Sequence, residues 1–231
     1  MATFRNIKEL SHYETMATDG EIGKIHDFLF DDTTWTIRYL VVDTGGWLPG
    51  KRVLLSPTAV KDTDVDNQKV VLDLTQEQVK NSPDISTDKP VSLQQQIELH
   101  DYYAWPYYWT SGEFYPVYPP MPVVVDPDKT LKASEQQVQE GDIHLRSTNE
   151  VMGYHIQARD DSVGHVEDFL IGDEKWKIHY IVVDTRNWWP GKKVLISPAW
   201  ISNVTWADEK VFVNMMKETI KESPEYYTPP Q

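Results

Sequence analysis

The chain contains a long internal repeat. Residues 23–57 read GKIHDFLFDDTTWTIRYLVVDTGGWLPGKRVLLSP, and residues 164–198 read GHVEDFLIGDEKWKIHYIVVDTRNWWPGKKVLISP. The two copies align without a gap, so that residue 164 corresponds to residue 23 and every other pair has the same offset of 141 positions. Solenoid repeats are much shorter, at about 20 to 50 residues. The repeat therefore predicts two whole small domains instead of a stack of short units.

Each predicted domain is small. The chain has 231 residues, and the duplication leaves roughly 80 residues for each domain, with a connector between them. A domain of that size has a thin core and is marginally stable alone. We therefore expect the two halves to pack on each other or on a partner. The hydrophobic fraction of 40% and the charged fraction of 25% are typical of a folded protein.

The chain is strongly acidic and has no cysteine. It has 36 acidic and 22 basic side chains, which gives a formal net charge of −14. This charge repels the phosphates of nucleic acids, so a nucleic acid is not expected as a partner. The absence of cysteine excludes disulfides, a thiolate nucleophile and thiolate metal ligands.

The sequence shows no sign of secretion or membrane insertion. The first residues, MATFRNIKEL, lack the basic and apolar regions of a signal peptide. No apolar run approaches the roughly 18 residues that a membrane-spanning helix needs. We expect a cytoplasmic protein that is not an integral membrane protein.

Hydrophobic patterning predicts several short strands in each copy. Residues 22–30 alternate between apolar and polar side chains, as in a half-buried strand. Residues 35–42 begin with the same period and end in an apolar run, which is typical of a central strand. Pro49 and Gly50 suit a type II turn. Further strands are predicted at residues 53–56, 60–63 and 70–74. Short strands separated by turn signals indicate a small antiparallel barrel or sandwich.

Two capping boxes predict helix starts. Thr75 is followed three residues later by Gln78, which predicts a short helix at the end of the first copy. Ser92 and Gln95 have the same spacing and predict a helix that extends to Tyr103. The first helix closes the repeat, and the second belongs to the connector.

The connector is rich in aromatic residues and proline. Residues 102–122 read YYAWPYYWTSGEFYPVYPPMP. The prolines exclude a continuous helix or a central strand and favour an extended course. The rings either strap across both domains and complete their thin cores, or they contact another chain. An exposed aromatic patch is unusual on a monomer, so strapping or self-association is the preferred interpretation.

These features together resemble the PRC-barrel family. The resemblance rests on the glycine before the long strand, the aspartate followed by apolar residues, the apolar strand ending in Val-Asp and the closing Ser-Pro. It covers residues 4–85 and 145–226. The family includes the cytoplasmic domain of the photosynthetic reaction centre H subunit and the C-terminal domain of a ribosome maturation factor. The resemblance implies a mainly β fold of two small antiparallel PRC-type barrels in tandem, each with a short C-terminal helix, joined by a helix and an extended connector.

The resemblance also divides the chain into three parts. Residues 1–85 form the first repeat, residues 86–144 the connector, and residues 145–231 the second repeat and the C-terminal tail. The whole arrangement is similar to bacterial tandem PRC-barrel proteins of unassigned function, which implies docking to proteins and not catalysis. The chain lacks the membrane helix of the H subunit and the N-terminal partner domain of the maturation factor. Membership in either complex therefore does not follow from the fold.

One group of carboxylates has the spacing of a metal-binding loop. Asp62, Asp64 and Asp66 resemble the start of a calcium loop. Such a loop has glycine at its sixth position and glutamate at its twelfth, where this chain has Asn67 and Asp73. A polar hairpin turn is the preferred interpretation, and no metal or cofactor is expected.

A second group could transfer protons. His26 lies beside Asp27, and a histidine near a carboxylate titrates near neutral pH. The second copy retains the aspartate as Asp168 but has Glu167 in place of the histidine. We therefore expect the aspartates to face solvent or to cap a turn. No catalytic residue is assigned, and the protein is not expected to be an enzyme.

Tryptophans flank the Pro-Gly turn in both copies, with a lysine close by. Exposed aromatic residues beside a cation are typical of a protein interface. Alternatively, each tryptophan caps its own barrel or packs between the barrels. The candidate protein-binding residues, with those of the connector, are Trp47, Trp188, Trp189, Lys192, Trp105, Tyr107, Tyr108 and Trp109.

These observations favour a non-catalytic adaptor or scaffold. The expected partner is another protein, with a membrane-bound complex among the candidates, or a second copy of the chain in a homo-oligomer. The alternative is a sensor that binds a small molecule or an ion in a cleft between the barrels, lined by Tyr39, Tyr180 and the connector. A further alternative, which the resemblance suggests, is an accessory protein of a photosynthetic reaction centre.

Overall fold

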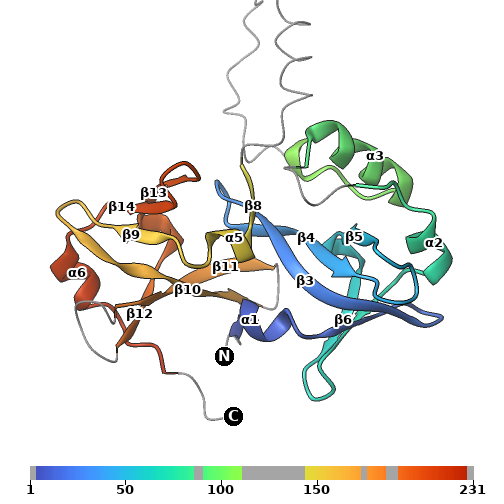
Figure 1. Ribbon diagram of the computed structural model, residues 1–231, viewed down its shortest axis with the longest axis horizontal. Helices are drawn as coiled ribbons and strands as arrows, with labels where there is room; N and C mark the ends of the chain where they lie inside the picture. Colours follow the sequence, from blue (N-terminus) through green and yellow to red (C-terminus); the bar gives the residue numbers. More distant parts are fainter. Residues whose placement is uncertain (1–3, 86–90, 111–143, 173–175, 186–191, 228–231) are drawn as a thin grey trace, which may run out of the picture.

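The computed structural model describes residues 4–85, 91–110, 144–172, 176–185 and 192–227 and shows a mainly β protein in two related halves (Figure 1). The first half contains β1 (Phe4–Asn6), α1 (Ile7–Leu10), β2 (Glu14–Met16), β3 (Glu21–Asp31), β4 (Thr36–Asp43), β5 (Arg52–Leu55), η1 (Pro57–Ala59), β6 (Val60–Asp64), β7 (Lys69–Leu72) and α2 (Gln76–Lys80). The connector contains α3 (Leu93–Tyr103) and η2 (Tyr108–Thr110). The second half contains β8 (Leu145–Ser147), α5 (Thr148–Val151), β9 (His155–Gln157), β10 (Ser162–Gly172), β11 (Lys177–Asp184), β12 (Lys193–Ile196), η3 (Pro198–Trp200), β13 (Ile201–Thr205), β14 (Lys210–Val213) and α6 (Lys217–Lys221).

The elements predicted from local patterns are confirmed. Strands β3 to β7 lie where alternation and turn signals predict them, and helices α2 and α3 begin at their capping boxes. In both boxes the N-cap hydroxyl accepts a hydrogen bond from the backbone of the third helical residue, and the glutamine there accepts one from the N-cap backbone. These elements depend on residues close in sequence, which explains why they can be predicted.

The first strand of each half pairs with the other half. Strand β1 is antiparallel to β10, with Phe4 opposite Gly172, and β8 is antiparallel to β3, with Leu145 opposite Asp31. Because residue 145 corresponds to residue 4, the two pairings are related by the repeat. The halves have therefore exchanged their first strands.

The two longest hairpins also meet between the halves. The Ile37 amide donates to the Trp176 carbonyl (2.8 Å), and the Ile178 amide donates to the Trp35 carbonyl (2.7 Å). Both tryptophans have positive φ angles, 56° for Trp35 and 51° for Trp176. These reciprocal hydrogen bonds join β4 to β11, so that within the described residues fourteen strands form one continuous sheet.

The prediction of two separate closed barrels is wrong, because the strands form one sheet that does not close into barrels. Closure of a barrel would require β5 to pair with β6, and β12 with β13, and neither pairing is present among the described residues. The long strands β3 and β10 instead use part of their length to pair with a strand from the opposite half. Hydrophobic alternation specifies which face of a strand is buried, but it does not specify the neighbouring strand.

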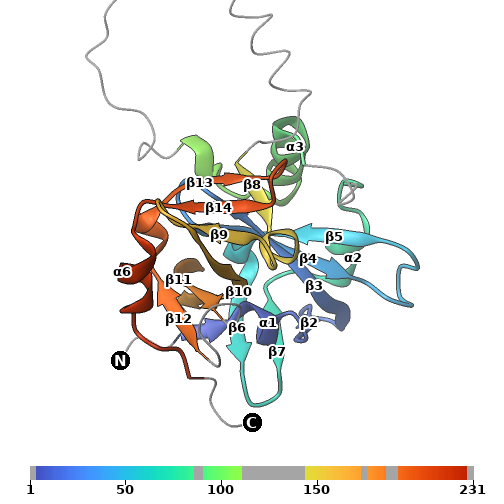
Figure 2. The ribbon, with the colours of Figure 1, turned by 60° about the vertical axis from the view of Figure 1, so that its left-hand side comes forward.

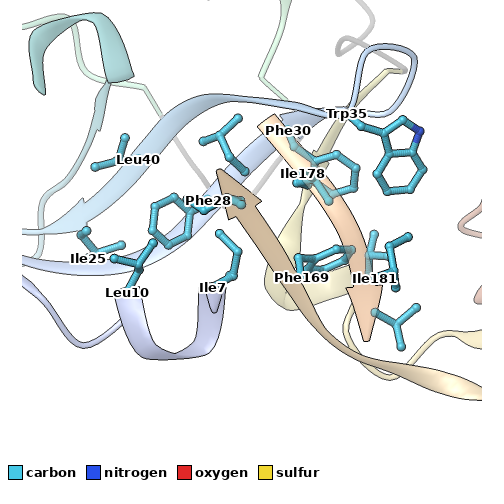
Figure 3. Close-up of a cluster of buried hydrophobic side chains, with 14 of the residues drawn as sticks. Ile7, Leu10, Ile25, Phe28, Phe30, Trp35, Leu40, Phe169, Ile178 and Ile181 are labelled. Atoms are coloured by element: carbon cyan, nitrogen blue, oxygen red, sulfur yellow. The ribbon is translucent and has the colours of Figure 1, made fainter. Parts of the chain in front are cut away.

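The halves share one hydrophobic core. A single cluster of buried side chains contains residues of both repeats. At its centre the ring of Phe30 contacts Phe169 across the junction (5.6 Å between centroids) and stacks on Trp35 (5.3 Å). Figure 3 shows Ile7 and Leu10 of α1 pointing toward Phe28 and completing this cluster. The two thin cores are thus joined, as their size predicts.

A buried aspartate caps the short helix of the opposite half. The carboxylate of Asp27 accepts hydrogen bonds from the Ser147 hydroxyl (2.5 Å), the Thr148 hydroxyl (2.8 Å) and the Asn149 amide (3.0 Å) at the start of α5. Asp168 accepts a longer bond from the Lys8 amide in α1 (3.2 Å). Only 8% of Asp27 and 4% of Asp168 is exposed, so the first alternative, that they face solvent, is wrong, and each caps a backbone segment of the other half. They fix the exchanged segments instead.

The two capping aspartates differ in how much they stabilise the folded protein. Burial raises the pKa of Asp168 above its ordinary value, and its hydrogen bonds to Phe169 and Lys8 only partly oppose this. A raised pKa means that folding favours the neutral acid, so the charged carboxylate contributes less stability at neutral pH. Asp27 has three cross-half donors within 3.0 Å, all of which would lose their acceptor on truncation.

We predict that Asp27→Ala lowers the free energy of unfolding by about 3 kcal/mol, because the buried Thr148 hydroxyl and two further donors at the start of α5 lose their acceptor. Asp168→Ala is the matched control and should cost about 1 kcal/mol. Urea unfolding of both variants at neutral pH measures the difference. Equal losses would show that Asp27 has no special role in holding the halves together.

We also predict that Gly164→Ala is strongly destabilising. Gly164 has a φ angle of 138°, and a Cβ atom built there would lie 2.0 Å from the Asp184 carbonyl oxygen. Because the three nearest atoms all belong to the backbone of Asp184 and Thr185, no side-chain movement can relieve the clash, and we expect a loss of about 4 kcal/mol. Gly46→Ala, where a Cβ meets nothing within 4 Å, should change stability little. Thermal unfolding compares the two, and similar melting temperatures would contradict the prediction.

Candidate functional site

Helix α3 covers the outer face of the first half. This face is the side of β3, β4 and β5 that points away from the shared core. Leu99 of α3 and Val91 before it pack on Tyr39, Val41 and Leu54, and all five side chains are buried. Figures 1 and 2 both show α3 over β4 and β5. The connector therefore completes a second, smaller core on this face.

A buried polar network fixes α3 in place. The Nδ1 atom of His100 lies 3.0 Å from the Pro106 carbonyl, which can only accept, so Nδ1 carries the proton. The Nε2 atom then accepts from the Tyr39 hydroxyl at 2.9 Å. The side-chain oxygen of Gln96, one turn earlier, accepts from the Tyr108 hydroxyl and lies 3.1 Å from that of Tyr39. Burial lowers the pKa of His100 and so favours the neutral imidazole, which serves here as a structural anchor.

The connector aromatics gather around His100. Trp105 stacks on Tyr103 (4.2 Å between centroids), and Trp109 lies 4.9 Å from the imidazole. Arg38 of β4 lies over the ring of Tyr108 at 4.1 Å, a cation–π contact. Residues Trp105, Tyr107, Tyr108 and Trp109 are all half-buried. The described part of the connector lies on the first half and not across both, and residues 111–143 lie outside the described part of the chain.

The remaining predicted interface residues lie at the turns. Trp47 is half-buried and packs against the main core. Lys192 forms an ion pair with Glu225 (3.2 Å). Trp188 and Trp189 lie outside the described residues, so the structure does not place them.

The equivalent outer face of the second half is more exposed. Tyr180, Val182 and Leu195 correspond to Tyr39, Val41 and Leu54 of the covered face. Val182 is buried beneath its neighbours, whereas Tyr180 and Leu195 are half-buried. Phe4 of the exchanged strand packs on Tyr180 (5.4 Å between centroids) and is 38% exposed, whereas its counterpart Leu145 is 6% exposed.

No helix among the described residues covers this second face as α3 covers the first. In Figures 1 and 2, β12 and α3 lie on opposite sides of the molecule. The C-terminal residues run along the edge of β12, where the Tyr226 amide donates to the Lys193 carbonyl (2.8 Å). We call Phe4, Leu170, Tyr180, Val182 and Leu195 the open face. Sequence reasoning missed Phe4 and Leu195 as site residues, although their alignment with Leu145 and Leu54 could have identified them.

The carboxylates singled out in the sequence have structural contacts. Asp64 accepts from the Asn67 amide (3.0 Å) within the turn between β6 and β7. Glu167 lies near His165 and Asp184, with ligand-type atoms within 4.8 Å of one another. Burial raises the pKa of Glu167, but hydrogen bonds from Lys8 and Lys193 outweigh this and hold it below its ordinary value.

The cleft between the halves differs from the one expected. A cleft of about 770 Å³ lies at the junction and is lined by Asp32, Arg146 and His179 among others. Neither Tyr39 nor Tyr180 lines it, because their side chains lie on the outer faces of opposite halves. The expectation of a cleft lined by these tyrosines is therefore wrong, since alternation alone left their direction open.

We predict that acidification releases α3 from the first half. Burial lowers the pKa of His100 below its ordinary 6.5, and the hydrogen bond to Pro106 only partly opposes this. The undocked histidine therefore binds a proton more readily, so docking is fully stable above pH 6.5 and weakens as the pH falls toward the lowered pKa. Hydrogen exchange of residues 93–103, corrected for intrinsic rates, should show less protection at about pH 5.5 than at about pH 7.5. His100→Gln should remove this pH dependence, and its persistence would assign it to another group.

Comparison with known proteins agrees with the fold of the first half. Residues 3–79 match the family model described as "PRC-barrel domain", which leaves the second half unassigned. An uncharacterized protein of Deinococcus radiodurans is 38% identical over 73 residues, which is 31% of this chain and 26% of the relative. The match thus spans about a quarter of that relative. No helix in the described part of the chain has the length and apolar character to cross a membrane. Residues 3–79, which include β1 to β7, are thus similar to a PRC-barrel domain.

Proposed function

We propose that the protein is a non-catalytic scaffold that docks another protein on the open face of its second half. The observation that carries the proposal is the difference between the two outer faces. The repeat gives both faces the same tyrosine and valine, but only the first has a helix packed on it within the described residues. The second face is the less covered of the two, since Tyr180 and Leu195 are half-buried and Phe4 is 38% exposed, and a partly exposed apolar patch is a candidate binding surface.

The rest of the fold supports a docking role. The exchanged strands and the shared core make the two halves one body, so the open face is held on a preformed sheet. A preformed surface loses little conformational entropy on binding. Trp188 and Trp189 lie in sequence between β11 and β12, two strands of the open face, and stay predicted contact residues.

A second candidate function is the binding of a small anion at the junction cleft. Arg146, Lys177 and His179 line this cleft in a protein whose net charge is −14. Asp32 already binds Arg146 (2.7 Å) and His144 (2.9 Å), which reduces the local positive charge. A thermal-shift screen of phosphates and carboxylates tests this candidate, because a ligand that binds only the folded state raises the melting temperature.

We predict that Leu195→Glu abolishes partner binding without unfolding the protein. Leu195 is half-buried on the open face, so a charge there remains hydrated in the free protein but is buried in the complex. Val65→Glu places the same charge on an exposed valine of the first half and is the matched control. The partner is identified by co-purification from the native host and is then titrated in purified form against all three proteins.

Binding should fall at least about a hundredfold in Leu195→Glu, a loss of roughly 3 kcal/mol, and stay unchanged in Val65→Glu. Circular dichroism and melting temperatures check that both variants remain folded. A partner that binds the folded Leu195→Glu variant as well as the wild type would contradict the proposed function. The absence of any partner that co-purifies with the wild type would also count against the proposed function.

A further inference from the structure

We propose that the open face receives an amphipathic helix of another protein that has the same contact pattern as α3. This inference rests on the proposed function and names the kind of partner. The first half already shows which structure fits such a surface, because α3 is seated on the equivalent strands. Because of the repeat, the surface under α3 and the open face can be compared residue by residue.

The surface under α3 makes apolar contacts with Leu99 and polar contacts with Gln96 and His100. Leu99 belongs to the same buried cluster as Tyr39, Val41 and Leu54. Gln96 and His100, one turn apart on the same side of the helix, lie at 3.1 Å and 2.9 Å from the Tyr39 hydroxyl. The helix therefore presents the amide of Gln96 at position i, the leucine at i+3 and the imidazole at i+4.

The open face has counterparts of both the apolar side chains and the tyrosine hydroxyl that contact α3 on the first half. Tyr180, Val182 and Leu195 have the same residue types as the covered face, and Leu170 lies opposite Tyr180 across the strand pair as Leu29 lies opposite Tyr39. Among the described residues, the Tyr180 hydroxyl has no hydrogen-bonding partner. It is therefore available to an amide or imidazole of an incoming helix, as the Tyr39 hydroxyl is to Gln96 and His100.

The charges around the open face favour an acidic helix from another protein. Lys177 and His179 are exposed at the start of β11, where the first half has Thr36 and Arg38. Glu98 and Asp101 are exposed on α3, and a helix that carries carboxylates in the same way would be attracted by the Lys177 ammonium group. A second copy of the chain is disfavoured as the occupant, because each copy has a net charge of −14 and already uses its own α3.

A peptide with the sequence of residues 91–110, labelled with fluorescein, tests the inference on the full-length protein. We expect saturable binding that a Leu99→Ser change in the peptide weakens about tenfold. Leu195→Glu in the protein should weaken binding at least about tenfold, and Val65→Glu should leave it unchanged. Lys177→Glu should weaken binding about threefold more than Lys61→Glu, which makes the same charge change at an exposed site of the first half.

A photoreactive group at position 99 of the peptide locates the bound helix. Cross-links to β11 and β12 support the inference, whereas cross-links to β4 and β5 would show that the peptide only replaces α3 on the first half. The absence of binding, or equal binding to Leu195→Glu, overturns the inference. The proposed function survives that result if the host partner is lost on Leu195→Glu, and it fails if the host partner is not lost.

Discussion

The structure depends on the exchange of the first strand between the two halves. Strand β1 completes the edge of β10, and β8 completes the edge of β3, so neither half has its full sheet without the other. The Asp27 carboxylate fixes one exchanged segment by accepting hydrogen bonds from the start of α5. A domain of about 80 residues has little core of its own. The exchange joins the small cores of the two halves into one larger core.

The same exchange makes the two outer faces comparable and leaves them different. Each outer face includes a residue from the opposite half, Leu145 on the first and Phe4 on the second. The connector joins the two repeats, and in the described part of the chain its helix α3 packs on the first face and not on the second. Within the described residues the first outer face is therefore covered by a helix and the second is not, and this difference is the basis of the proposed docking role.

Local sequence signals predicted the fold to the level of single elements. Strands β3 to β7 and the capped helices α2 and α3 follow from alternation, turn residues and capping boxes, each of which involves neighbours in the sequence. The three-residue strands β1 and β8 could not be predicted in the same way. They are too short to show a period, and their partners lie more than a hundred residues away. The closed barrels expected from the repeat were wrong for this reason.

The candidate site was only partly predictable. Trp105, Tyr107, Tyr108 and Trp109 were selected as aromatic residues, and the structure gathers them around His100 on the first half. Their role could not be derived from composition, because aromatic side chains serve cores and interfaces equally well. Tyr180 was expected in a cleft and lies on the open face, because the direction of a side chain depends on strand register.

Hydroxyl-radical footprinting of the isolated protein tests the central claim most directly, because each half contains the control for the other. The account predicts that Tyr180 and Phe4 are oxidised much faster than Tyr39, which is 0% exposed, even though the repeat makes the two tyrosines equivalent. Equal protection of Tyr39 and Tyr180 would contradict the account, because it would show that the second outer face is covered like the first.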